Sequence, residues 1–199
     1  MEFKISILFI TQIENLIQQN NIIELETILH EIHFADIAEI MNDLDTSEAI
    51  YLFNLLDSEI TAEILLELDD EVRENILRSL SAKEIAEELD ELDTDDAADI
   101  IAELPQSKKA QVISELEDVE HAKDIVDLLR YDENTAGGIM AKELVKVNEN
   151  WNVLTCVKEM RHQAENVTRV HSIYVVDDED RLKGRLSLKD LLTTSTKTQ

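Results

Sequence analysis

Residues 80–104 read LSAKEIAEELDELDTDDAADIIAEL. This stretch consists of two consecutive twelve-residue units, each of which begins with a leucine, and of the leucine that begins a third unit. The same spacing extends in both directions from this stretch. Internal repetition at a fixed period is typical of stacked repeat architectures. The leucine recurs at Leu44, Leu56, Leu68, Leu80, Leu92, Leu104 and Leu116.

The residue after each leucine marks the start of a helix. Five of these residues are Asp or Ser, which are favoured N-caps, and one is a proline, which is favoured in the first turn. Glu48, Glu84 and Asp96 each lie three residues after such a cap, where a capping-box partner belongs. The followers are Asp45, Asp57, Asp69, Ser81, Asp93, Pro105 and Glu117.

The eighth and ninth positions after each leucine are mostly apolar, and they form a stripe on one helix face with the next leucine. Helices of about ten residues are marginal alone, so these units must bury their stripes against neighbours in a superhelical array. Glu88 is the exception to the pattern. The pairs are Leu52/Phe53, Ile64/Leu65, Ile76/Leu77, Glu88/Leu89, Ile100/Ile101 and Val112/Ile113.

The net charge is −27, and 30 of the 45 acidic residues lie between Glu31 and Arg130 with only 7 of the 18 basic ones. Such a charge argues against nucleic acid as a partner, because a polyanion is repelled and no basic patch is present. It argues equally against an anionic membrane surface. Two interpretations remain open: a solvated acidic surface, or a surface that recruits divalent cations.

Asp95 and Asp99 are four residues apart in a predicted helix, so they project from one face and repel each other. Mg²⁺ suits such a pair, since it typically uses one or two carboxylates and keeps several waters. No calcium-binding EF-hand loop is present. His30 and His33 lack any companion metal-ligand pattern and are interpreted as surface or packing residues. The lone Cys156 excludes an internal disulfide.

The pattern changes after Arg130. We predict strands at 144–147, 172–177 and 182–187, a helix at 153–163, and a last helix from Leu188. The sequence therefore predicts an α+β, mostly α, protein with two domains. Residues 1–130 form the acidic helical repeat, and residues 131–199 form a smaller β-α-β-β-α unit.

Three stretches carry a resemblance to a known family: LRYDENTAGGIM at 129–140, IYVVD at 173–177 and GRLSLKDLL at 184–192. They resemble the junction and first CBS motif of MgtE-type magnesium transporters. The acidic short-helix repeat before them is similar to the N-terminal domain of that family. The resemblance covers essentially the whole chain.

The resemblance implies a homodimeric Mg²⁺ transporter or channel, paired through its CBS region, with these domains on the cytoplasmic side of the bacterial inner membrane. The chain would itself be soluble and would end after the first CBS motif, without the second motif or the transmembrane domain. In that family Mg²⁺ bridges acidic surfaces and closes the pore. Regulation by Mg²⁺ is therefore the expected function.

The resemblance also implies site residues. The Mg²⁺ ligands would be Asp95, Asp99 and the carbonyl of Gly137, with Glu63 as a further candidate. Ser187 and Asp190 match a pattern that contacts an adenine nucleotide in nucleotide-binding CBS domains. The same two residues equally suit an N-cap and capping box for the last helix.

Two other functions compete with Mg²⁺ sensing. Acidic short-helix repeats also resemble flagellar motor switch proteins, which suggests a protein-interaction scaffold. An enzyme is disfavoured, because no nucleophile–base set, Gly-rich phosphate loop or catalytic metal motif is found.

Overall fold

The computed structural model describes residues 5–132, 134–164, 167, 170 and 172–195. The chain divides into two compact units, Met1–Leu92 with Asp96–Asp132, and Asp93–Asp95 with Glu133–Gln199. The first is helical and the second contains a small sheet. The predicted α+β, mostly α, fold class is confirmed.

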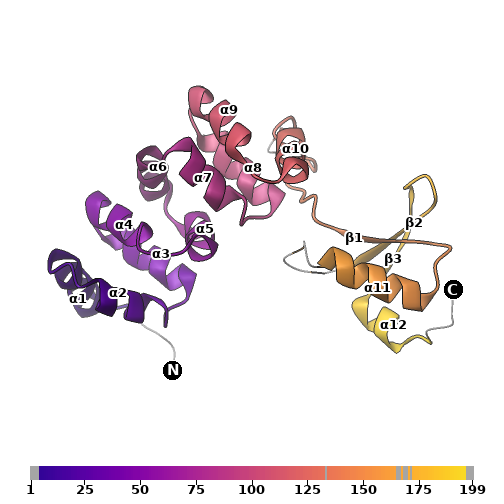
Figure 1. Ribbon diagram of the computed structural model, residues 1–199, viewed down its shortest axis with the longest axis horizontal. Helices are drawn as coiled ribbons and strands as arrows, with labels where there is room; N and C mark the ends of the chain where they lie inside the picture. Colours follow the sequence, from indigo (N-terminus) through magenta and orange to yellow (C-terminus); the bar gives the residue numbers. More distant parts are fainter. Residues whose placement is uncertain (1–4, 133, 165–166, 168–169, 171, 196–199) are drawn as a thin grey trace. The chain divides into compact units, whose positions relative to one another are not determined.

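The first unit is a row of short helices (Figure 1), and each twelve-residue unit of the sequence supplies one of them. Alternate helices pack together: α3 on α5, α4 on α6, α5 on α7, and α7 on α9. The helices are α1 (Ile7–Gln18), α2 (Ile22–Leu29), α3 (Phe34–Asp43), α4 (Thr46–Phe53), α5 (Ser58–Glu67), α6 (Asp70–Ser79), α7 (Ala82–Leu89), α8 (Thr94–Glu103), α9 (Gln106–Glu115) and α10 (Val119–Leu128).

The repeat leucines end helices or follow them closely, and all but the half-buried Leu56 are buried. The N-caps predicted from the sequence are confirmed in part. Ser81 and Glu84 form a complete capping box, and the Asp45 carboxylate accepts from the N–H groups of Ser47 and Glu48. After Leu116, the N-cap of α10 is Asp118 rather than Glu117.

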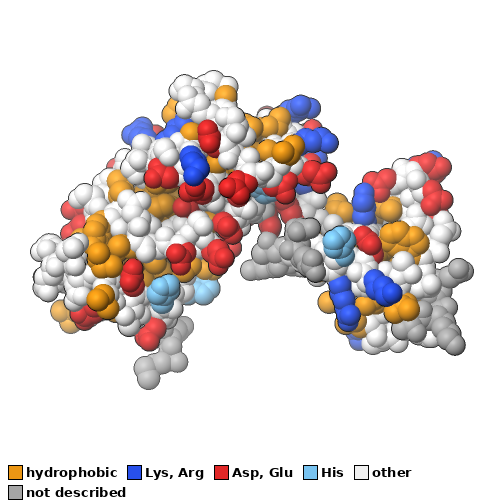
Figure 2. All heavy atoms as spheres, in the orientation of Figure 1, with side chains coloured by type: hydrophobic (Ala, Val, Ile, Leu, Met, Phe, Trp, Pro, Cys, Tyr) orange, Lys and Arg blue, Asp and Glu red, His pale blue; other side chains and the backbone are white. Residues whose placement is uncertain are grey.

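Acidic side chains are spread over the helical unit in the view of Figure 2. No helix of the described residues combines the length and the apolarity that crossing a membrane would require.

The second unit has the predicted β-α-β-β-α order: β1 (Val145–Asn148), α11 (Val153–Gln163), β2 (Ile173–Val176), β3 (Leu182–Leu186) and α12 (Leu188–Thr193). Strand β1 pairs in parallel with β2, which pairs antiparallel with β3. The core is small and aliphatic. It consists of Val145, Val147, Cys156, Met160, Ile173 and Leu191.

The acidic turn between β2 and β3 is held by Asp177, which is 6% exposed. Its carboxylate accepts from the backbone N–H groups of Glu179 and Arg181, each at 3.0 Å, and pairs with the Arg181 and Lys183 side chains. The backbone N–H of Arg181, followed by these side chains, lowers the Asp177 pKa to about 2. The turn is therefore a structural feature built around a fixed anion.

Candidate functional site

Helix α8 carries both predicted aspartate ligands. Asp95 lies in its first turn and is half-buried, and Asp99 lies one turn later and is exposed. Their side chains project from the same face because residues four apart on a helix are neighbours. The helix thus presents two carboxylates at a spacing that one cation can share.

The first two residues of α8, Thr94 and Asp95, belong to the second compact unit. Glu143 of the same unit fixes this end of the helix. Glu143 Oε1 accepts from the Thr94 N–H at 3.0 Å, and Oε2 accepts from the Thr94 hydroxyl at 2.9 Å. The Lys142 N–H donates to the same hydroxyl oxygen at 3.2 Å. A carboxylate at this end of a helix satisfies an N–H that has no intrahelical partner and is stabilised by the helix dipole. Asp95 therefore follows a residue with a well-defined position.

A pocket of about 220 Å³ in the helical unit is lined by residues of α5, α6 and α8, and Asp99 is one of them. Charged groups dominate its wall, and the apolar part of the wall comes from α5 and α8. The lining residues are Leu65, Leu66, Arg73, Asp96, Asp99, Ile100 and Glu103. Asp99 thus shares a cavity with two further acids and one arginine.

The other two predicted ligands lie on different elements. Glu63 is half-exposed on α5, outside the lining of this cavity. Gly137 lies in a turn of the second unit, where the Gly138 N–H donates to the Thr135 carbonyl at 3.0 Å. Their participation with Asp95 and Asp99 stays a prediction.

Within the described residues, no three Asp, Glu, His or Cys side chains converge as a complete set of metal ligands. The donors on α8 are nevertheless hard carboxylate oxygens. Such a pair fits Mg²⁺, which accepts few protein ligands and retains its waters, better than it fits a metal that demands a full protein cage.

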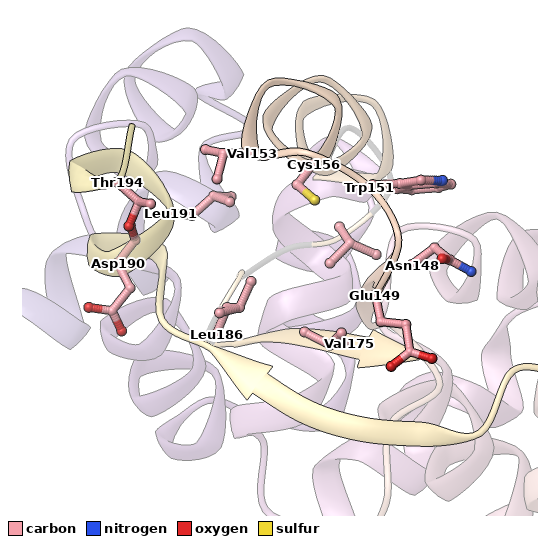
Figure 3. A pocket seen from close by; sticks show the side chains of 11 residues that line it. Asn148, Glu149, Trp151, Val153, Cys156, Val175, Leu186, Asp190, Leu191 and Thr194 are labelled. Atoms are coloured by element: carbon pink, nitrogen blue, oxygen red, sulfur yellow. The ribbon is translucent and has the colours of Figure 1, made fainter. Parts of the chain in front are cut away.

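The second unit contains a pocket of about 240 Å³. Figure 3 shows Asp190 of α12 and Thr194, the C-cap of that helix, on one side of it, and Trp151, Asn148 and Glu149 on the other. Apolar residues of β1, β2, β3, α11 and α12 line the rest. The lining is Val147, Asn148, Glu149, Trp151, Val153, Cys156, Val175, Leu186, Asp190, Leu191 and Thr194.

Ser187 and Asp190 form a local pair. The Asp190 N–H donates to Ser187 Oγ at 3.0 Å, and that hydroxyl donates to Asp190 Oδ2 at 2.6 Å. Ser187 is therefore the N-cap of α12. Of the two, only Asp190 lines the pocket, so the nucleotide role predicted for both has geometric support at Asp190 alone.

Two residues that the fold brings to these sites, Trp151 and Arg73, were not predicted from the sequence. Trp151, the only tryptophan in the chain, lines the pocket, and its singularity was the one available signal. Arg73 reaches the α8 cavity from α6 and carried no signal, because its partner Glu103 is distant in sequence.

The chain matches two family models: "MgtE intracellular N domain" over residues 32–134 and "CBS domain" over residues 136–196. Two relatives, both called magnesium transporter MgtE, come from Thermus thermophilus and Enterococcus faecalis. They are 37% and 38% identical over 40% and 37% of this chain. The alignments span only 20% and 16% of those relatives.

Two solved structures are similar over 95% of this chain. One is the soluble part of a magnesium transporter, with 27% identity, a TM-score of 0.78 and 74% of that chain covered. The other is the cytosolic domain of the Mg²⁺ channel MgtE in complex with ATP, with 30% identity, a TM-score of 0.84 and 77% covered.

Proposed function

Because the chain belongs to the MgtE family of magnesium transporters, we propose that it is the Mg²⁺-sensing regulatory region of such a transporter. In the whole protein, Mg²⁺ bridges acidic surfaces of the helical and CBS domains and closes a membrane pore. When Mg²⁺ falls, repulsion separates those surfaces and the pore opens. The observation that carries the proposal is the pair of carboxylates on α8, in a chain of net charge −27.

Electrostatics supports such a switch. Two like unit charges about 4 Å apart repel by roughly 4 kcal/mol at an effective dielectric constant of 20, and by about 1 kcal/mol in water. A divalent cation converts this repulsion into attraction. The ion shifts the population of arrangements by the difference in its affinity for them, so several weak hydrated sites suffice.

The ligands we propose are Asp95 and Asp99, completed by the carbonyl of Gly137, with Glu63 as a second acidic contact. Each supplies an oxygen donor of the kind that Mg²⁺ prefers. The two hydrogen bonds from Thr94 to the Glu143 carboxylate fix the start of the helix that carries the aspartates. Homodimerisation through the CBS region and a position at the cytoplasmic face of the bacterial inner membrane are further parts of the proposal.

An adenine nucleotide is the proposed ligand of the pocket in the CBS domain. The described lining includes the carboxylates of Glu149 and Asp190 but neither Lys nor Arg. Carboxylates accept from ribose hydroxyls and repel phosphates, whereas Trp151 offers a face for a base. This motif would thus hold the nucleoside part, and Ser187 would act by positioning Asp190.

Titration of the chain with MgCl₂ tests the proposal. We expect a saturable rise in melting temperature and a saturable change in the small-angle scattering profile at millimolar Mg²⁺, beyond NaCl controls of equal ionic strength. A response that only tracks ionic strength would favour the scaffold interpretation and overturn the proposal. The named relatives are transporters, which agrees with a regulatory rather than an enzymatic role.

A further inference from the structure

We propose that Arg73 is a built-in counter-cation that weakens Mg²⁺ binding at the α8 face and so sets the concentration at which the sensor responds. This inference rests on the proposed function, since it concerns the affinity of the same site. It assigns a role to a residue that supplies no oxygen ligand and is not part of the repeat pattern.

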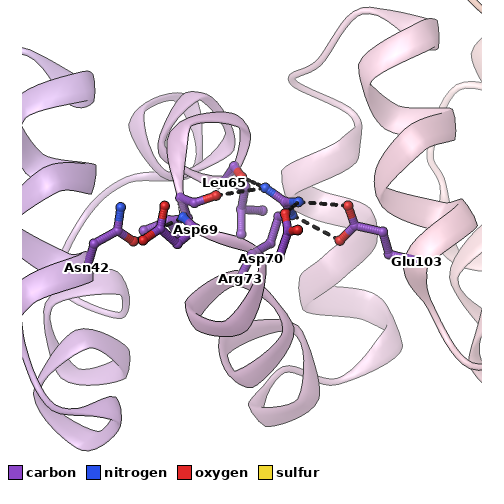
Figure 4. Close-up of polar contacts among 7 residues, drawn as sticks. Asn42, Leu65, Asp69, Asp70, Arg73 and Glu103 are labelled. Atoms are coloured by element: carbon purple, nitrogen blue, oxygen red, sulfur yellow. Dashed lines mark hydrogen bonds and ion pairs between the residues drawn. The ribbon is translucent and has the colours of Figure 1, made fainter.

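The guanidinium of Arg73 is held in place from several sides (Figure 4). Its Nε and Nη2 donate to the two carboxylate oxygens of Glu103 at 2.9 and 2.8 Å, and Nη2 also donates to Asp70 at 2.7 Å. A bidentate ion pair of this kind fixes the plane of the guanidinium as well as its position. The Arg73 side chain is only 12% exposed.

Arg73 also caps the end of α5. Its Nη1 donates to the carbonyl of Leu68 at 2.8 Å and makes a longer contact of 3.5 Å with that of Leu65. Carbonyls at a helix C-terminus lack intrahelical donors and favour a positive charge. The hydrogen bond to Glu103 is the main cause of an Arg73 pKa above its ordinary value. The positive charge is therefore permanent and nearly immobile.

The charge lies beside the proposed ligand, because Arg73 lines the same cavity as Asp96, Asp99 and Glu103. The other charged residues of the described lining are all acidic. Arg78, on the same helix α6, differs: it is 64% exposed, pairs with Glu74 and is absent from the lining. The two arginines thus have the same charge but different relations to Asp99.

A fixed positive charge near a carboxylate opposes the arrival of another cation, and the effect on a divalent ion is twice that on a monovalent one. At a separation of about one Debye length and an effective dielectric constant of about 40, between the values for water and for a protein surface, screening leaves a change in affinity of about threefold. Neutralising Arg73 should therefore tighten Mg²⁺ binding. Neutralising Glu103 should weaken it, because the charge of Arg73 would no longer be balanced.

The test is isothermal titration calorimetry of the full chain with MgCl₂ at constant ionic strength. We expect Arg73→Met to lower the Kd for Mg²⁺ about threefold, Arg73→Lys to keep the wild-type value, and Glu103→Gln to raise it. Arg78→Met is the matched control and should leave the Kd unchanged. Circular dichroism melts establish that each variant is folded, and Glu103→Gln keeps the test decisive if Arg73→Met does not fold.

Unchanged affinity in folded Arg73→Met, or in Glu103→Gln where Arg73→Met does not fold, would overturn the inference while leaving Mg²⁺ sensing intact. Equal tightening in the Met and Lys variants would assign the effect to packing and would also overturn it. A wild-type chain that binds no Mg²⁺ at all would instead refute the proposed function itself.

Discussion

Glu88 Oε2 accepts the hydroxyl of Thr61 at 2.6 Å inside the helical array, joining α7 to α5. Glu88 occupies a position where other repeat units carry Leu, Ile or Val, and it is 8% exposed. Burial, with smaller effects from Glu87 and Glu91, raises the pKa of Glu88 from 4.5 to about 7, against the lowering effect of the Thr61 hydrogen bond. A polar side chain has thus been placed in an apolar interface at an energetic cost.

This cost depends on pH. A carboxyl whose pKa is raised in the folded state opposes folding as it ionises, so stability should fall as pH rises from about 4.5 to about 7 and then level off. Glu88→Gln should remove this loss while keeping an acceptor for Thr61. We expect the variant to be about 2 kcal/mol more stable than wild type at pH 8 and equal to it near pH 4.

Urea unfolding monitored by circular dichroism at several pH values measures the difference. Glu71→Gln, which neutralises an exposed acid on α6, is the control for the general benefit of removing negative charge. If both variants showed the same pH-independent gain, the buried carboxyl would not be the cause.

The capping box of α7 gives a second prediction. Ser81 Oγ accepts from the Glu84 N–H at 3.2 Å, and the Glu84 carboxylate accepts from the Ser81 N–H at 2.7 Å. Ser81→Ala should cost about 1 kcal/mol of unfolding free energy, whereas Ser81→Asp should cost much less because Asp also caps. Equal losses for Ala and Asp, measured by urea unfolding, would contradict this role.

A third prediction concerns Glu143. Its Ala variant would leave the N–H and hydroxyl of the 2% exposed Thr94 without their carboxylate, which should cost about 1–3 kcal/mol. Glu149→Ala, which removes an exposed acid of the same unit, should cost little. Thermal melts that rank the two variants equally would show that the bonds from Glu143 to Thr94 contribute nothing measurable.

The pocket of the CBS domain provides its own reporter, since Trp151 is the only tryptophan. Adenosine and ATP should both change its fluorescence saturably, and Asp190→Asn should weaken both responses. Ser187→Ala should mainly lower the stability of α12, because its hydroxyl caps that helix. An Asp190→Asn variant that binds as wild type would remove Asp190 from the proposed site.

Much of the fold follows from local chemistry. The twelve-residue spacing predicts the helix starts, and the order and approximate bounds of the elements after residue 140 are confirmed. Helix α10 begins one residue later than the spacing predicts, because Asp118 is a favoured N-cap whose carboxylate accepts from two N–H groups at the start of the helix.

Long-range partners were not predictable in the same way. The hydrogen bonds of Arg73 with Glu103 and of Thr94 with Glu143 join residues far apart in sequence, and no repeat or motif indicates them. Glu88 is the intermediate case. An acid in an apolar stripe indicates a special environment, but it does not identify Thr61 as the hydrogen-bond partner. The aspartate pair on α8 was predictable from its spacing, whereas the positions of the other two proposed ligands, Gly137 and Glu63, depend on tertiary structure.

The most direct test of the account is calorimetric titration of the chain with MgCl₂, comparing wild type with Asp95→Asn/Asp99→Asn. The matched control is Glu39→Gln/Asp43→Asn, an exposed pair at the same spacing on α3 that loses the same charge. We predict saturable millimolar binding by wild type and control, and its loss in the double aspartate variant. Equal binding by all three proteins would contradict the claim that α8 is where Mg²⁺ is sensed.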